Sequence, residues 1–330
     1  MKIAIVGCGA LGSYYGGKLH QANQTVHFLL RSDYEHVKRV GIKVRSPQGN
    51  FHFQPKSANH PTNIGTCDLI IVSLKTTAND QLKDLITPLL HSSTAVLCLQ
   101  NGLGNIEKLA EFIPTNQLLG GLCFICVNRP SPGTIVHLDH GQIVIGEAMG
   151  WPEPRTHDLA TMFRNSGIPC KVTDILPQAQ WEKLVWNIPF NGLGVVSSLG
   201  HAFFDSTESR FPTKRTKPFT TEQLLADEQW HKTVQLLMHE IIDVANQLRF
   251  PVVKTLADKM IRNTQSMKDY RPSTVVDFDL GRPMEFDSMF RLPLEKAQTT
   301  TVKIPTWERL CSILSQLASE KLISEGQQNQ

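Results

Sequence analysis

The sequence predicts an α/β protein in which an amino-terminal doubly wound parallel sheet is followed by an all-helical domain. Three observations carry this prediction. The chain opens with an apolar run, a glycine-rich turn and a helical stretch; strand-like and helix-like segments then alternate; and beyond Asp174 the pattern changes to long helical segments. Because 330 residues exceed what one hydrophobic core usually supports, we expect two domains, 1–174 and 175–330.

Composition narrows the class of protein. Hydrophobic residues make up 41% of the chain and charged residues 19%, which is typical of a globular protein. A formal net charge of +3 is too small and too dispersed to indicate nucleic-acid binding. The longest apolar runs, such as 69–74 and 95–99, are too short to span a membrane, and the chain enters a strand at once, leaving no room for a signal peptide. We therefore expect a cytoplasmic protein without nucleic-acid or membrane partners; its oligomeric state stays open, with a homodimer as one candidate.

The first element is a strand at 1–6 that runs into a glycine motif made of Gly7, Cys8, Gly9, Ala10, Leu11 and Gly12. Gly7 can make the tight turn, Gly9 lets the backbone approach a pyrophosphate, and Gly12 lets the following helix pack against the strand. A second strand, 25–30, follows the helix. This context predicts a Rossmann-type dinucleotide site, with a purely structural glycine turn as the alternative.

Arg31 ends the second strand, nineteen residues after Gly12. Sites for NAD usually carry Asp or Glu near this position, whereas sites for NADP carry Arg. A guanidinium matches a 2′-phosphate in charge and in its forked donor geometry. Arg31 therefore predicts NADP(H) as the cofactor, unless it is a solvated surface arginine.

Two further strands end in polar residues. The apolar run 67–74 reads as a central parallel strand that ends at Lys75 and is followed by a helix over 76–90. The next strand, 95–99, ends just before Asn101. Because ligands bind beyond the carboxyl ends of parallel strands, we expect Lys75 to reach the cofactor and Asn101 to contact both cofactor and substrate. The alternative is that each caps a helix or completes a turn.

Cysteine and histidine residues give no sign of a metal site. The seven cysteines are odd in number and lie mostly in apolar contexts, which indicates reduced, buried thiols. Cys123 and Cys126 fall on a predicted strand, where residues three apart face opposite sides, so a zinc or redox pair is disfavoured. His137 and His140 lie at a predicted hairpin turn, 139–141, and lack partners at ligand spacing. We expect no bound metal.

A polar stripe marks the first helix of the second domain. Lys183, Asn187 and Asn191 follow one another at intervals of four, which places them within roughly 80° of each other on a helix. The rest of the helix is apolar, and Pro189 should kink it. A polar stripe on such a helix lines a cleft, or else forms a buried asparagine network with a snorkelling lysine.

Together these segments resemble the ketopantoate reductases, also called 2-dehydropantoate 2-reductases, over nearly the whole chain. The matching motifs are GCGALG at 7–12, SLK at 73–75, QNGLG at 100–104, the stripe on the helix, STVVD at 273–277 and GRPMEFD at 281–287. The resemblance implies a Rossmann domain with an all-helical second domain. It further implies NADPH-dependent reduction of a branched 2-keto acid, 2-dehydropantoate, in pantothenate synthesis.

The same resemblance implies roles for single residues. Lys183 would be the general acid, Glu285 would contact the nicotinamide end of the cofactor, and the substrate would be bound by Asn187, Asn191 and Ser273. Two alternatives stay open: a reductase of another 2-keto acid, and a non-catalytic NADPH sensor of the same fold. The presence of Lys183 and Glu285 argues against the sensor, which has no use for a proton donor.

The chain departs from the family pattern on the substrate side. Residues 205–218 form a polar, basic insertion interrupted by prolines, which predicts a solvated loop rather than a lid or a partner contact. His201 stands where the family often has another asparagine, and 288–291 replaces a usual Asn-Gly pair. These departures leave the substrate side chain open, whereas the cofactor motifs are intact.

Overall fold

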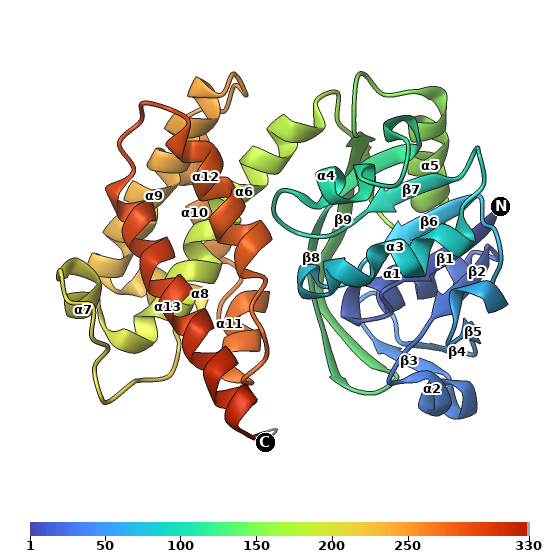
Figure 1. The fold of residues 1–330 in the computed structure, drawn as a ribbon, viewed down its shortest axis with the longest axis horizontal. Helices are drawn as coiled ribbons and strands as arrows, with labels where there is room; N and C mark the ends of the chain where they lie inside the picture. The colour runs from blue at the N-terminus through green and yellow to red at the C-terminus, as the bar shows by residue number, and fades with distance from the viewer. Residues whose placement is uncertain (329–330) are drawn as a thin grey trace. The chain divides into compact units, whose positions relative to one another are not determined.

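The computed structural model describes residues 1–328, with side chains as far as Glu320. The chain divides into two compact units, Met1–Leu176 and Pro177–Gln330. The first unit is a sheet covered by helices and the second is entirely helical in its described residues, so the predicted fold class is confirmed (Figure 1). The division falls two residues beyond the boundary expected at 174, at the start of the helix α6 (Leu176–Val196).

The first unit is built on one sheet, which has ten strands among the described residues, in the order β4-β3-β9-β8-β7-β6-β1-β2-β5 with β10 beside β9. The part from β5 to β8 is parallel throughout and has the strand order of a dinucleotide-binding fold, 3-2-1-4-5-6, when β3 and β4 are left out of the count. The strands are β1 (Lys2–Val6), β2 (Thr25–Leu29), β3 (Ile42–Arg45), β4 (Phe51–Phe53), β5 (Lys56–Ala58), β6 (Leu69–Val72), β7 (Ala95–Cys98), β8 (Leu118–Ser131), β9 (Thr134–Glu147) and β10 (Cys170–Val172).

The helices of this unit are α1 (Ala10–Gln21), α2 (Tyr34–Val40), α3 (Leu82–Ile86), α4 (Asn105–Ala110) and α5 (Pro154–Asn165). The single helix predicted over 76–90 is wrong. Only α3 is α-helical there, between two 3₁₀ segments, Thr76–Gln81 and Thr87–Leu89. Ala78 leaves helical geometry at φ −111° and ψ 15°, and Pro88 lies in the second 3₁₀ turn, where its ring cannot continue the α-helical hydrogen-bond ladder.

Both faces of the central strands are buried, as the continuous apolar runs predict. Along β1, Ile3 and Ile5 join one hydrophobic core while Ala4 and Val6 join the other. The strand β6 alternates in the same way, with Leu69 and Ile71 on the first side and Ile70 and Val72 on the second. Burial on both faces explains why β6 is entirely apolar and why β1 is apolar after its first residue, Lys2.

The long hairpin β8–β9 turns at Pro132-Gly133, where Gly133 has φ 65° and Ser131 pairs with Thr134. The hairpin turn expected at 139–141 is wrong. His140 (φ 64°) and Gly141 (φ 129°) instead form an irregularity within β9, where the register against β8 shifts. Bulges and turns demand the same positive φ angles, so the sequence signal for the two is shared.

The tip of this hairpin pairs with β3 rather than ending in solvent. Residues 134–136 lie parallel to 43–45, and the backbone N–H of Lys43 donates to the carbonyl of Gly133 at 2.8 Å. The helix α1 packs against both β8 and β9. The hairpin therefore lies across α1 and joins it to the β3–β4 pair.

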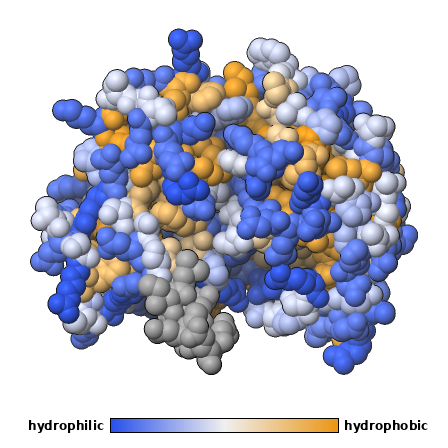
Figure 2. Space-filling view, in the orientation of Figure 1, coloured by the Kyte–Doolittle hydropathy of each residue, from blue (hydrophilic) through white to orange (hydrophobic). Residues whose placement is uncertain are grey.

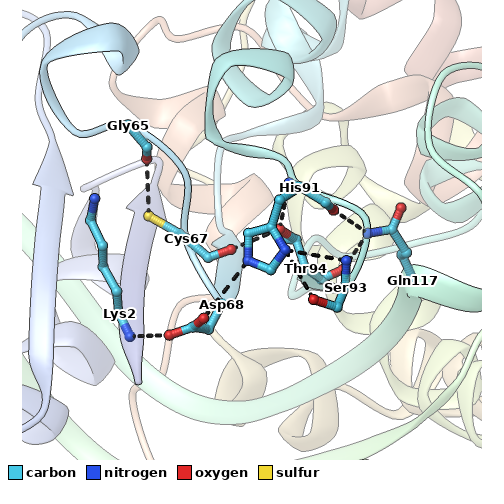
Figure 3. A network of polar contacts seen from close by, with 8 residues as sticks. All are labelled: Lys2, Gly65, Cys67, Asp68, His91, Ser93, Thr94 and Gln117. Atoms are coloured by element: carbon cyan, nitrogen blue, oxygen red, sulfur yellow. Dashed lines mark hydrogen bonds and ion pairs between the residues drawn. The ribbon is translucent and has the colours of Figure 1, made fainter.

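A polar network ties together the amino-terminal ends of the parallel strands (Figure 3). The Lys2 backbone N–H donates to Asp68 at 2.6 Å, and the buried Thr94 hydroxyl donates to the carbonyl of Cys67 at 2.7 Å. Gln117 Nε2 donates to the carbonyls of His91 and Thr94 at 2.9 and 2.8 Å. This edge is opposite to the one that carries the glycine motif, so its polar residues hold strands together.

The second unit contains α6, α7 (His201–Asp205), α8 (Thr221–Ala226), α9 (Glu228–Gln247), α10 (Thr255–Gln265), α11 (Ser273–Asp279), α12 (Leu292–Gln298) and α13 (Pro305–Gln328). The helix α6 continues through Pro189, and most of its residues from Trp181 onward are buried. A Cβ at Gly192 would lie 2.7 Å from Leu310 of α13, and one at Gly194 would lie 2.6 Å from Val275 of α11. Both glycines let neighbouring helices approach α6 closely.

The insertion 205–218 is anchored rather than merely solvated. Phe211 packs edge-on against Phe203 of α7, at 5.6 Å between ring centroids, and the guanidinium of Arg215 lies 5.1 Å from the Phe211 ring. Arg215 also pairs with Glu320 of α13 at 2.6 Å, and Thr216 donates its N–H to the carbonyl of Ser198 at 2.9 Å. Most residues of the insertion are exposed, as a solvated loop predicts, but these contacts tie it to α7 and α13.

Three surface and chemical features concern the described residues as a whole. On the face shown in Figure 2, hydrophilic side chains cover most of the surface, with apolar areas scattered between them. The described helices include none that is both long and apolar enough to cross a membrane. None of the seven cysteines, all of which lie in the described part of the chain, forms a disulfide, and within residues 1–328 no group of three or more His, Cys, Asp or Glu residues could hold a metal ion.

Candidate active site

The glycine motif occupies the turn from β1 into α1, and each glycine there has a different surrounding. Gly7 has φ 104°, and a Cβ on it would lie 2.2 Å from the backbone nitrogen of Leu74. A Cβ on Gly12 would lie 2.4 Å from both the Gly7 carbonyl and the Ser73 hydroxyl. Around Gly9, in contrast, no atom lies within 4 Å of the Cβ position. Two glycines thus serve close packing, and the third faces open space where a ligand could approach the backbone.

The end of β6 holds this turn in place. The Ser73 hydroxyl donates to the carbonyl of Gly7 at 2.8 Å, and the Ser73 N–H donates to the carbonyl of Val6 at 2.8 Å. Gly9, the first residue before α1, has no side chain to cap the helix, and no acidic residue lies in the first turn. The amino terminus of α1 therefore presents backbone N–H groups and the positive end of the helix dipole, both of which favour an anion.

Arg31 lies just beyond β2, beside the glycine motif in the sheet because Leu29 pairs with Val6. Its side chain is exposed. Two residues later, Asp33 is 6% exposed and forms an ion pair with Arg129 of β8. Burial opposes ionisation of Asp33, but the hydrogen bonds and charge of Arg129, with the Ser32 hydroxyl and the Gly133 N–H, leave the pKa of its carboxyl below the ordinary value.

A chain of amides joins the loops that carry Lys75 and Asn101. Gln100 Nε2 donates to the carbonyl of Leu74 at 3.0 Å and to Asn79 Oδ1 at 2.8 Å. Asn79 Nδ2 donates to Asn105 Oδ1 at 3.2 Å, and Asn105 Nδ2 donates to the carbonyl of Asn101 at 2.9 Å. The loops after β6 and β7 are therefore fixed to one another, at the same edge of the sheet as the glycine motif.

In the second unit, the polar stripe lies on α6. Asn187 and Asn191 are 7% and 3% exposed, and Lys183, one turn earlier, is half-buried. The apolar neighbours of the stripe are buried, for example Leu184, Val185 and Phe190. Buried carboxamides on an apolar helix need polar partners, because an unpartnered amide costs about 1–3 kcal/mol.

Asn191 finds its partners in the protein. Its Oδ1 accepts a hydrogen bond from the backbone N–H of Thr274 at 3.0 Å, and its Nδ2 donates to the carbonyl of Asn187 at 2.9 Å. Thr274 is the second residue of α11, so Asn191 satisfies one of the N–H groups that a helix start leaves open. The neighbouring Ser273 is exposed at the first position of α11. Asn191 thus connects the stripe to the helix that begins with Ser273.

Glu285 lies between α11 and α12 and is 8% exposed. It lies two residues before a π-helical turn, Asp287–Arg291, and its carbonyl accepts the N–H of Met289 in that turn at 3.2 Å. Single π-helical turns are frequent at functional sites, because they aim one side chain that regular helix geometry would turn elsewhere.

Several residues that hold these sites together were not predicted from the sequence. Asp33, Arg129, Asn79 and Asn105 carry no motif of their own, and their partners are up to 96 residues distant in the chain. Of these residues, only Asp33 could have been selected from the sequence, because an acidic residue near the end of β2 is typical of a site for NAD. The partner of its carboxylate therefore bears on which cofactor binds.

Comparison with known proteins gives the same assignment for both units. The family model described as ketopantoate reductase PanE/ApbA matches residues 3–150, and the model for the C-terminal part of the same family matches residues 218–318. The chain belongs to the ketopantoate reductase family. It is an oxidoreductase of that family, and its resemblance to the family's motifs is confirmed.

Individual relatives cover almost the whole chain. The 2-dehydropantoate 2-reductase of Nostoc sp. is 38% identical over 310 residues, which span 92% of this chain and 91% of that protein. The crystal structure of 2-dehydropantoate 2-reductase from Geobacter metallireducens GS-15 matches with a TM-score of 0.87 at 39% identity, covering 96% of this chain and 99% of the other. D-mandelate dehydrogenase, solved with NADH and anilino(oxo)acetate, has the same fold, with a TM-score of 0.82 at 21% identity over 97% and 99% of the two chains.

Proposed function

We propose that this protein reduces 2-dehydropantoate to pantoate with NADPH, in the cytoplasmic synthesis of pantothenate and coenzyme A. The observation that carries the proposal is the joint presence of a glycine turn open to a ligand at Gly9 and the Lys183/Asn187/Asn191 stripe on α6, in a chain of the ketopantoate reductase family. The named relatives at 38% and 39% identity support the substrate.

The residues present fit a dinucleotide phosphate. The empty Cβ position at Gly9 leaves room for a pyrophosphate against the N–H groups at the start of α1. Residues Gly7 through Gly12 would hold this pyrophosphate, together with Lys75 and Asn101 from the neighbouring loops. The exposed guanidinium of Arg31 suits a 2′-phosphate, while the nearest carboxylate in sequence, Asp33, is engaged by Arg129. This combination supports NADPH over NADH.

In the proposed reaction NADPH, which the glycine motif, Arg31 and Glu285 would hold, would supply a hydride to the carbonyl carbon of the 2-keto acid. The ammonium of Lys183 stabilises the charge that develops on the carbonyl oxygen and then donates its proton to it. The hydroxyl of Ser273 and the amide of Asn187 bind the substrate, Asn191 holds the start of α11 in position, and Glu285 contacts the nicotinamide end of the cofactor. Buried apolar side chains lie on either side of the stripe on α6, and Lys183 itself is half-buried.

The experiment is a turnover assay that follows NADPH consumption with 2-dehydropantoate and with 2-keto acids of smaller and aromatic side chains. We expect the highest kcat/KM for 2-dehydropantoate. Lys183→Ala should keep NADPH affinity and lose about two to four powers of ten in kcat, and Lys183→Arg should not restore it, because guanidinium is too weak an acid. An alanine variant with near-normal kcat excludes Lys183 and leaves Lys75 as the next candidate.

The cofactor is tested separately by the dissociation constants of NADP⁺ and NAD⁺. Arg31→Asp should reverse the preference, because it removes the partner of the 2′-phosphate and adds repulsion. Arg164→Asp in α5 is the control for a charge reversal elsewhere in the same unit. Equal affinity of the unmodified protein for both cofactors contradicts the assignment. Light scattering would test the homodimer, which we keep as a proposal.

One observation favours a second candidate, a reductase of a different 2-keto acid. His201 stands where the resemblance leads us to expect a substrate-binding asparagine. Its Nε2 hydrogen-bonds with the Thr233 hydroxyl at 2.9 Å, and its Nδ1 lies 3.2 Å from a carboxylate oxygen of Asp205, with which it pairs when the ring is protonated. Its ring also packs edge-on against Trp230, at 4.7 Å between centroids. A histidine ring held by these contacts would present a different surface to the substrate than an asparagine. A preference for an aromatic or shorter 2-keto acid in the turnover assay would support this candidate.

A further inference from the structure

Asp33 lies in the segment that follows β2, where the tip of the β8–β9 hairpin contacts it. Its carboxylate receives the guanidinium of Arg129, the hydroxyl of Ser32 at 3.1 Å and the backbone N–H of Gly133. The Asp33 side chain is 8% exposed and that of Arg129 is 37% exposed. The hairpin thus brings one positive charge to a buried negative charge.

This pair lies close to both the glycine motif and Arg31. Asp33 is two residues from Arg31 along the chain, and β2 is the neighbour of β1 in the sheet. The charges of both partners also reach the Cys8 thiol of the glycine motif. Burial raises the pKa of that thiol, Asp33 raises it further and Arg129 opposes the rise. A dinucleotide on this motif would therefore have its adenosine ribose within reach of all three charged residues.

We propose that the Arg129–Asp33 ion pair sets the cofactor preference, by neutralising the carboxylate that would otherwise repel a 2′-phosphate or accept the ribose hydroxyls of NAD. The inference rests on the proposed NADPH dependence. With the pair intact, Arg31, Asp33 and Arg129 sum to one positive charge next to the ribose. Without Arg129 the sum is zero, and Asp33 is released to bind Arg31 or the 2′-hydroxyl. Asp33 and Arg129 act here as positioning residues, through the charge that Arg31 presents.

The test is the ratio of NAD⁺ to NADP⁺ dissociation constants, measured by calorimetry without substrate. Arg129→Met should lower this ratio by roughly three- to tenfold, because it exposes the carboxylate to the 2′-phosphate. Asp33→Asn should raise the ratio by a similar factor, because it frees the Arg129 guanidinium for the phosphate. Arg129→Lys, which keeps the charge, and the double change Asp33→Asn with Arg129→Met, which removes both charges, should stay near the ratio of the unmodified protein.

The opposite signs separate this role from a merely structural one. Both single changes break the same contact between hairpin and β2, so a structural role predicts the same direction of change for both. Shifts in one direction, or an unchanged ratio in both variants, overturn the proposal. If Arg129→Met does not fold, as judged by circular dichroism, Asp33→Asn decides the matter alone, since only a rise in the ratio is then acceptable. A protein that prefers NAD⁺ would contradict the proposed cofactor, while the opposite shifts would still be measurable.

Discussion

The side-chain oxygen of Asn191 in α6 accepts the backbone N–H of Thr274 in α11 at 3.0 Å, so a residue of the polar stripe caps the helix that begins with Ser273. Thr274 is 3% exposed, and its N–H has no access to water as a substitute partner. The stripe is therefore also part of the internal structure of the helical unit.

Asn191→Ala should lower the free energy of unfolding by about 1–3 kcal/mol, because the N–H of Thr274 is left buried without an acceptor. Ser273→Ala, at an exposed position of the same helix, should change stability by less than about 0.5 kcal/mol. Denaturant unfolding of both variants provides the comparison. Full stability of Asn191→Ala would show that the cap is dispensable and would leave only a role in substrate binding.

The glycine motif offers a matched pair of substitutions. Gly9→Ala should fold with nearly unchanged stability, because its Cβ enters open space, and should weaken cofactor binding by tenfold or more, because that space is the proposed place of the pyrophosphate. Gly12→Ala should lower stability by about 1–3 kcal/mol, because its Cβ meets the Gly7 carbonyl and the Ser73 hydroxyl at 2.4 Å. Thermal unfolding and calorimetric titration would distinguish the two. Unimpaired cofactor binding by Gly9→Ala would contradict the site.

The anchored insertion gives a prediction about stability. Phe211→Ala removes a ring that lies between Phe203 and the Arg215 guanidinium and should cost about 1–2 kcal/mol. Lys214→Ala, at an exposed neighbouring position, is the control and should have no measurable effect. Deleting 206–217 should lower the unfolding temperature for the same reason. An unchanged unfolding temperature after the deletion would mean that these contacts do not persist in solution.

His137 should make the first unit sensitive to mild acid. Burial lowers the pKa of its ring, although the carbonyls of His140 and Asp139 oppose the change in part. The unfolded chain therefore takes up a proton at higher pH than the folded one, and stability is full above the ordinary histidine pKa of about 6.5 and falls as the pH drops below it. His137→Gln should flatten this dependence of the denaturant midpoint between pH 7.5 and 5.5, where the exposed His157→Gln should not. Equal slopes for the two variants would exclude His137 as the source.

The structure could be predicted from the sequence wherever a local pattern corresponds to a single kind of structure. A continuous apolar run such as 69–72 becomes a strand buried on both faces, and intervals of four place Lys183, Asn187 and Asn191 on one helix. Where two structures share a signal, prediction failed: His140 and Gly141 have the positive φ of a turn but form an irregularity within β9, while Pro132-Gly133 makes the turn.

Pairings between distant segments were out of reach for a different reason. The partner of Asp33 is 96 residues away, and nothing in the composition of either segment selects Arg129 among the other arginines. The insertion likewise looks solvated because its charges dominate its composition, whereas its anchoring depends on Phe203 and Glu320 on other helices. Contacts between distant segments depend on the folded chain, and no short segment of the sequence indicates them.

The pairing of β3 with the hairpin has a consequence for how the chain emerges from a ribosome. Residues 42–45 are synthesised early, but their sheet partners at 134–136 follow about ninety residues later. During that interval the nascent chain holds β3 with one edge open, and open edges of strands pair readily with other chains. Folding of the amino-terminal unit in the cell is therefore completed only when the β8–β9 hairpin leaves the exit tunnel, and a translational pause before residue 134 would prolong the time in which the chain is prone to aggregate.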